Sequence, residues 1–200
     1  MNSPGDWDWD RYRKLLHVLA RSLQLSPRLR TRFTESDLVS MTLERAWEHV
    51  DECEAGKEEH ADECKADTEA RRIKWLYTIL QHVFIDKLRE AYADKCDVRR
   101  EQEALGESSA RLEKYLEAKG SSPSERAEKA EQLLRLAEAM ERLLDDERDA
   151  VIQHYLLKLK LGEIASQLPP TKNGRRTKKA VAGLLARGLH KLRVYLKDSE

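Results

Sequence analysis

Two histidines and two cysteines are spaced as a metal site could be. His49, Cys53, His60 and Cys64 follow the pattern H-x3-C-x6-H-x3-C. On helical segments the members of each pair share a face at i and i+4, a geometry that can hold zinc. The spacing matches no zinc motif that we can name, and the surrounding stretch is polar. The interpretation as unrelated loop residues is therefore favoured, and we expect no metal and no cofactor.

Catalytic chemistry finds little support in the sequence. No glycine-rich phosphate loop follows a strand, and no serine has the context of a nucleophile elbow. The paired acids Asp145 and Asp146 are typical of a helix start, and no histidine is placed to form a relay with Asp37 or Asp86. We therefore expect no catalytic residue, and a protein that is not an enzyme.

The C-terminal quarter has the pattern of a helix-turn-helix. A short helix, LGEIASQL, is followed by the helix breaker Pro169-Pro170 and by a basic helix from about Thr177 to Leu196. Small residues in the middle of its polar face would let the backbone approach DNA, and basic residues near each end could hold phosphates. The alternative is that these cations only solvate a helix face. The predicted polar face consists of Lys179, Ala182, Gly183, Ala186, His190 and Arg193.

Composition supports a helical protein with an uneven charge distribution. Charged residues make up 37% of the chain, aromatic residues 6%, and the formal net charge is zero. That zero is an average: residues 51–69 contain nine acids and two lysines, whereas residues 171–200 contain nine Lys or Arg and two acids. The odd number of cysteines and the lack of a signal peptide or membrane span predict a cytoplasmic protein.

Hydrophobic periodicity of 3.6 residues predicts an all-α fold of two small helical domains. We expect a domain over residues 8–98, a flexible linker over 99–122, and a helix-turn-helix domain over 123–197. Thr34 with Asp37, and Ser122 with Glu125, are expected to cap helices, and Asp145 and Thr177 to cap two others. The expected apolar stripes, in chain order, are Tyr12, Leu15, Leu16, Leu19 and Leu23; Val39, Leu43, Ala46, Trp47 and Val50; Ile73, Leu76, Tyr77, Leu80, Phe84 and Leu88; Leu133, Leu136, Ala137, Met140 and Leu144; Val151, Ile152, Tyr155 and Leu156; Leu161, Ile164, Ala165 and Leu168; and Val181, Leu184, Leu185, Gly188 and Leu192.

Three stretches together resemble a known family. LAEAMERLLDDERDAVIQHYLLKLKLGEIASQL, resumed as TKKAVAGLLARGLHKLRVYL, is similar to region 4 of the extracytoplasmic-function sigma factors of bacterial RNA polymerase. ESDLVSMTLERAWEHV resembles region 2.2, and RRIKWLYTILQHVFIDKLRE resembles regions 2.3 and 2.4. The stretches cover about two thirds of the chain, in the family's order and with a linker between them.

The resemblance implies a sigma factor that directs the polymerase to specific promoters and initiates transcription. Its partners would be core RNA polymerase and promoter DNA, with no membrane, and the resemblance leaves open whether an anti-sigma protein is a further partner. Duplex DNA at the −35 element would be contacted by Arg175, Arg176, Thr177, Lys178, Lys179, Ala182, Arg187 and His190. The −10 element would be contacted by Lys74, Trp75, Thr78, Gln81, His82, Asp86 and Lys87. Core polymerase would be bound by Asp37, Leu38, Met41, Thr42, Arg45 and Trp47, although plain core packing is the alternative for Trp47 and Trp75.

The sequence departs from the family pattern at four places. Ser40-Met41 replaces a polar pair in region 2.2, and Gln81-His82 replaces Arg-Asn in the −10 helix. The acidic insert 51–69 is longer than expected. The turn PPTKNGRR is also longer than the two or three residues usual in the family, so Arg175 and Arg176 would either add phosphate contacts or shift the docking angle.

Two other classes of function stay open. A stand-alone helix-turn-helix regulator would bind palindromic DNA as a dimer without polymerase, with half-sites about one helical turn apart. A protein-interaction module would use the acidic insert and helix faces to bind protein partners, and would show no salt-dependent DNA binding.

Overall fold

The computed structural model describes residues 7–23, 25, 27–55, 68–91, 112, 114–116, 122–170 and 174–197. This described part is helical and contains no strand, which confirms the all-α prediction. The chain divides into two compact units, Met1–Leu134 and Arg135–Glu200. The predicted linker 99–122 lies almost wholly outside the described residues, so the predicted domain limits stay a prediction.

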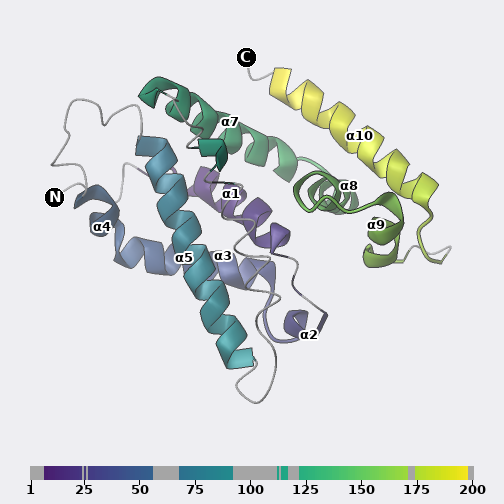
Figure 1. Cartoon of the computed structure of the whole chain (residues 1–200), viewed down its shortest axis with the longest axis horizontal. Coiled ribbons are helices and arrows are strands. Elements are labelled where there is room, and N and C mark those ends of the chain that lie inside the picture. Colours follow the sequence, from purple (N-terminus) through teal and green to yellow (C-terminus); the bar gives the residue numbers. More distant parts are fainter. Residues whose placement is uncertain are drawn as a thin grey trace. The chain divides into compact units, whose positions relative to one another are not determined.

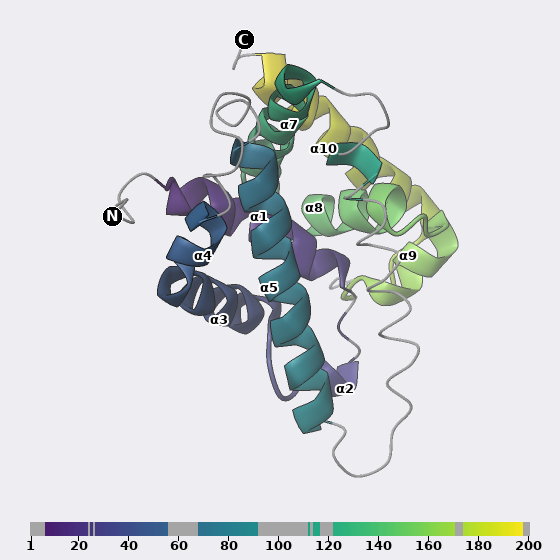
Figure 2. The ribbon, with the colours of Figure 1, turned by 60° about the vertical axis from the view of Figure 1, so that its left-hand side comes forward.

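The first unit is built on three helices that pack against one another: α1 (Trp9–Ser22), α3 (Glu35–Glu48) and α5 (Thr68–Ala91). The long α5 crosses α3 in the view of Figure 1 and α1 in the view of Figure 2. Two short helices, α2 (Pro27–Arg30) and α4 (Val50–Ala55), flank α3, and α4 packs against α5. The N-terminal part of α7 (Pro123–Glu141) also belongs to this unit, where Glu131 accepts two hydrogen bonds from the guanidinium of Arg11, at 3.0 and 2.8 Å.

Local sequence explains where these helices begin. Thr34 caps α3: its hydroxyl accepts from the Asp37 amide, while the Asp37 carboxylate accepts from the Thr34 amide at 2.7 Å. Ser122 and Glu125 form the same reciprocal pair before α7. Both predicted capping boxes are confirmed, and each satisfies backbone donors that a helix start leaves open.

The core of the first unit follows the predicted stripe on α5, and all six residues of that stripe are buried. On α3 the prediction is partly wrong, because Trp47 is 55% exposed, whereas Leu38 and Thr42 are fully buried. Thr42 is accommodated because its hydroxyl donates to the Leu38 carbonyl at 2.7 Å.

The second unit contains α8 (Asp145–Val151), the π-helix η2 (Ile152–Leu156), α9 (Leu161–Gln167) and α10 (Lys178–Lys197), together with the end of α7. In Figure 1 the yellow α10 runs past α8 and α9, and it packs against both. The predicted stripe of α10 is confirmed in full, since Val181, Leu184, Leu185, Gly188 and Leu192 are buried.

Two stripes in the second half of the chain are wrong in part. On α7 the leucine-rich run offers more than one helical register, and Leu134 is buried while Leu136 is exposed. Leu144 is exposed as well, because it is the N-cap of α8; Asp145 is therefore the first helical residue, not the cap. Tyr155 and Leu156 are exposed because the chain widens into η2 after Val151, which breaks the 3.6-residue period.

No helix in the described part of the chain is long and apolar enough to cross a membrane. Most of the acidic insert 51–69 lies outside the described residues, since only its ends belong to α4 and α5.

At Gly188 the backbone of α10 lies close to α8, and this predicts opposite effects of two Gly-to-Ala substitutions. A Cβ at Gly188 would lie 3.1 Å from Val151 Cγ2 and 3.5 Å from the Glu147 carbonyl oxygen, whereas one at Gly183 would meet only Arg187 Nη1, at 3.4 Å. Alanine in a helix is favoured over glycine by about 0.5–1 kcal/mol. Overpacking a tight contact costs roughly 1–3 kcal/mol. We therefore expect Gly183→Ala to raise the melting temperature and Gly188→Ala to lower it, as followed by circular dichroism. An equal rise in both variants would contradict the close contact.

Candidate nucleic-acid interface

The short helix α9 forms one side of the candidate interface. Its start is held by the Glu163 carboxylate, which accepts from the Lys160 amide at 2.7 Å. Ile164, Ala165 and Leu168 are buried, so the predicted apolar face is present, except that Leu161 is only half-buried. The helix ends before Pro169-Pro170, as predicted.

The start of α10 is also determined by local sequence. The Thr177 hydroxyl accepts from the Ala180 amide at 3.2 Å, which confirms the predicted cap. The helix has 20 residues, none of them acidic. At 1.5 Å per residue it is about 30 Å long, which is sufficient to lie along a major groove.

The exposed face of α10 has small side chains near its middle and positively charged side chains at its ends. Lys179 at one end and Arg193 and Lys197 at the other are exposed, and Ala182, Ala186 and His190 lie exposed between them. Helical spacing of three or four residues places these side chains on one stripe, opposite the buried one. The stripe has the form that close approach to a duplex requires: small side chains where backbones meet and cations where phosphates lie.

A buried acid attaches the other side of α10 to α8. The side chain of Glu147 is 2% exposed, and its carboxylate accepts from Lys191 Nζ at 2.7 Å and lies 3.4 Å from Arg187 Nε. Burial by itself raises the pKa of this carboxyl, but the hydrogen bonds from Lys191, Leu144 and Arg187 outweigh it, and the pKa is lowered. Glu147 therefore stays ionised at neutral pH and holds two cations of α10 against α8.

The predicted −35 residues occupy this region with different exposures. Arg175, Thr177, Lys178, Lys179, Ala182 and His190 are exposed, and the Arg187 side chain, although paired with Glu147, is 61% exposed. Arg176 differs, because its side chain is only 11% exposed and pairs with Asp146 of α8. Its guanidinium also donates to the Pro169 carbonyl at 2.9 Å.

The predicted −10 residues lie along α5. Thr78 and His82 are exposed, and Lys74, Trp75 and Gln81 are half-buried. The Thr78 hydroxyl donates to the Lys74 carbonyl at 3.0 Å, as an exposed helical threonine commonly does. The structure therefore places these side chains on one helix with part of their surface open.

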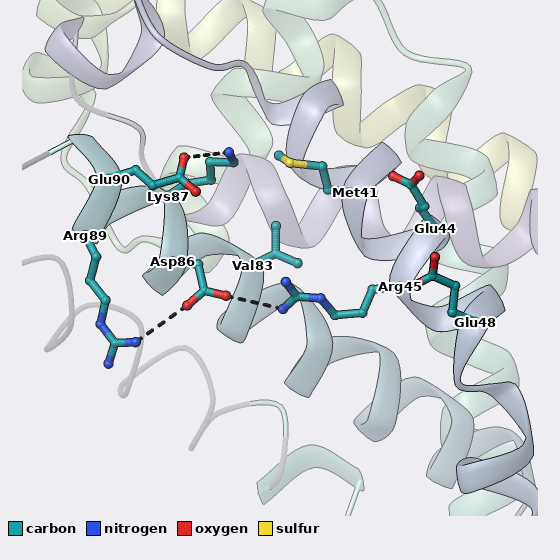
Figure 3. Close-up of a pocket in the computed structure, with 9 residues that line it drawn as sticks. All are labelled: Met41, Glu44, Arg45, Glu48, Val83, Asp86, Lys87, Arg89 and Glu90. Carbon is teal, nitrogen blue, oxygen red and sulfur yellow. Dashed lines mark hydrogen bonds and ion pairs between the residues drawn. The ribbon is translucent and has the colours of Figure 1, made fainter.

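Asp86 and Lys87, at the far end of that set, line an open groove between α3 and α5. Asp86 lies 3.4 Å from Arg45 Nη1 and 3.5 Å from Arg89 Nη1, and Lys87 pairs with Glu90 at 2.7 Å. Figure 3 shows these charged groups around Met41 and Val83. The groove combines an apolar floor with charged walls, a combination suited to a protein partner.

The predicted polymerase-binding residues on α3 do not form one surface. Leu38 and Thr42 are fully buried, so their side chains are closed to a partner. Asp37 is engaged in the capping box, and hydrogen bonds from Thr34 hold the pKa of its carboxyl below its usual value. Met41 and Arg45 reach the groove, and the exposed Trp47 lies beside Trp9, with ring centroids 5.6 Å apart.

The sequence patterns did not predict the ion pairs of Asp146 and Glu147 or the hydrogen bonds of Arg148. Arg148 closes the end of α7, since its guanidinium donates to the carbonyls of Met140, Glu141 and Leu143 at 2.7–3.1 Å. One signal was available: Glu147 lies three and four residues before the buried Ala150 and Val151, so an acid occupies an apolar position. The cations Arg187 and Lys191, spaced by four on α10, are its complement.

The possible zinc residues stay largely untested. His49 is exposed and Cys53 is half-buried, while His60, Cys64 and Cys96 lie outside the described residues. Within the described part of the chain, no group of three or more potential ligands could hold a metal ion.

Comparisons with known proteins do not identify the chain. No protein-family model, curated protein or solved structure matches it. Its function is therefore inferred from the residues and the geometry.

Replacing Glu147 tests its role in the second unit. Glu147→Gln removes the charge between two cations, and we expect a loss of roughly 1.5–3 kcal/mol in the free energy of unfolding at pH 7. Because the folded pKa is lowered from 4.5, the contribution is present above pH 4.5 and is lost as the pH falls through the folded value. Urea denaturation of both proteins at several pH values should show the difference shrinking in acid. Glu141→Gln, the same change at an exposed acid of the second unit, is the control and should stay within about 0.5 kcal/mol. A pH-independent penalty for Glu147→Gln would contradict this role.

Proposed function

We propose that this chain is a sigma factor that directs bacterial RNA polymerase to promoters, contacting DNA chiefly through α10. The observation that carries the proposal is the exposed stripe of α10, where Ala182, Ala186 and then His190 lie between Lys179 and the pair Arg193 and Lys197. A protein-facing helix would place large apolar side chains at the centre of its contact. A stripe of small residues between cations is better matched to a duplex.

The packing of α9 supports the same proposal. In a helix-turn-helix, the first helix braces the second, which enters the major groove. Here α9 packs against α10. Lys178 lies over α9 as well, because a Cβ at Gly162 would fall 3.0 Å from Lys178 Cε. The first helix of the motif and the recognition helix are therefore in direct contact.

The first unit would supply the remaining functions of a sigma factor. We assign the binding of core polymerase to the groove lined by Met41 and Arg45 and to the exposed Trp47 elsewhere on α3. The exposed part of α5, with Thr78 and His82, would contact the −10 element, where partly unstacked bases need polar and aromatic partners. These assignments follow the sequence resemblance, and they place the protein's action in the cytoplasm.

Two binding experiments test the proposal. The full chain should bind a fluorescein-labelled random-sequence duplex with an affinity that falls steeply with salt, because phosphate contacts release counterions. It should also co-purify with purified bacterial core RNA polymerase. Tight binding to palindromic DNA as a dimer, without polymerase, would favour a stand-alone regulator. If the chain showed neither salt-dependent DNA binding nor polymerase binding, a protein-interaction module would be the favoured function.

The stripe of α10 predicts a specific pair of substitutions. Ala186→Glu puts a longer, negatively charged side chain at the centre of the contact, and we expect at least a tenfold loss of duplex affinity, about 1.4 kcal/mol. Ala186→Ser keeps the side chain small and uncharged and should bind like the unmodified protein. Both variants should retain helicity and co-purify with core polymerase. Equal duplex affinity of the two variants, measured by fluorescence anisotropy, would remove α10 from the interface.

A further inference from the structure

We propose that the segment of residues 174–177, which leads into α10, forms a second contact to the DNA backbone, in which Arg175 binds a phosphate and Arg176 only positions this segment. This inference rests on the proposed function, and it assigns different roles to two adjacent arginines of the same charge.

The guanidinium of Arg176 interacts with the rest of the protein through two of its nitrogens. Its Nε donates to the carbonyl of Pro169, just after α9, at 2.9 Å. Its terminal nitrogen pairs with the carboxylate of Asp146, in the first turn of α8. A planar guanidinium makes two such bonds at once, which an ammonium group cannot reproduce. Because the side chain is 11% exposed and its charge is matched by Asp146, Arg176 has little left for a phosphate.

Arg175 has the opposite surroundings. It is exposed, and no residue in the described part of the chain forms an ion pair or hydrogen bond with its side chain. Gly174, just before it, has a φ of 99°, in the left-handed region that glycine tolerates and other residues rarely adopt. The backbone conformation at Gly174 and the attachment at Arg176 therefore determine where Arg175 lies.

The charge around Arg175 indicates the kind of partner. Lys178 and Lys179 are exposed three and four residues later, and the first turn of α10 contains no acid. These cations favour an acidic partner, and the proposed function supplies one, since a duplex held by α10 brings phosphates along both sides of that helix. The turn that is longer than usual in the family would thus add one backbone contact beside the recognition helix.

The test uses the full chain and the labelled random-sequence duplex, with anisotropy measured over about 50–200 mM salt. Arg175→Ala should make the slope of log affinity against log salt shallower by about 0.9, the value for one phosphate, with an unchanged melting temperature. Arg13→Ala, an exposed arginine on α1, is the control and should leave the slope unchanged.

Asp146→Asn separates the two possible roles of Arg176. If Arg176 itself bound a phosphate, removing the neighbouring acid would keep or raise the affinity. If Arg176 positions the segment, Asp146→Asn should lower the affinity and reduce the slope, as Arg175→Ala does, and combining the two changes should add little. Arg176→Lys retains the charge but not the paired bonds, and should also weaken binding. Gly174→Ala disturbs the same segment without changing charge, so a loss of slope there supports the inference even if Asp146→Asn folds poorly.

Three results would overturn the inference. Arg175→Ala could bind with an unchanged slope, Asp146→Asn could bind as tightly as the unmodified chain, or Arg176→Lys could retain full affinity and slope. If the proposed function fails, the unmodified chain itself will show no salt-dependent binding. Failure of this inference alone leaves that binding intact, so the two failures are distinguishable.

Discussion

The second unit depends on one buried carboxylate. Glu147 lies in the first turn of α8 with its side chain closed to solvent, and it remains ionised because Lys191 and Arg187 reach it from α10. A buried, ionised carboxylate without partners would destabilise the folded state. The pairing of Glu147 with the two cations therefore determines both the rotation of α10 and its position along its axis. Gly188, one residue after Arg187, lets the two backbones approach, since even a methyl group would press on Val151. With that side of α10 fixed, the stripe running from Lys179 to Lys197 faces outward.

The neighbouring acids of α8 serve the same arrangement. Asp146 holds Arg176 before α10, and Asp145 lies 3.1 Å from Arg148, whose guanidinium closes the end of α7. The basic residues near the C-terminus thus form two groups. One group is neutralised by α8 and holds the helices together, and the other, which includes Lys179 and Arg193, is exposed. Net charge alone conceals this division, because the formal charge of the chain is zero.

Sequence patterns predicted those elements whose signals are local and strong. The stripes of α5 and α10, the boxes at Thr34 and Ser122 and the cap at Thr177 follow from periodicity and short-range hydrogen bonding, and each is present. The predictions failed where several local arrangements were equally compatible with the sequence and tertiary packing determined which one formed. The leucines of α7 allow several registers, η2 interrupts the period before Tyr155, and the burial of Leu38 in place of Trp47 depends on how α1 and α5 meet α3. The pairing of Glu147 with residues 40 and 44 positions away could not be predicted from local sequence.

We propose that this chain gives RNA polymerase its promoter specificity. Transcription in a purified system tests this proposal most directly. Core polymerase with and without the full chain would be given a pool of bacterial genomic fragments, and the 5′ ends of the transcripts would be sequenced. The account predicts transcripts that depend on the chain and share a sequence at a fixed distance upstream of their starts. Transcripts that are identical with and without the chain, under conditions where it binds core polymerase, would contradict it.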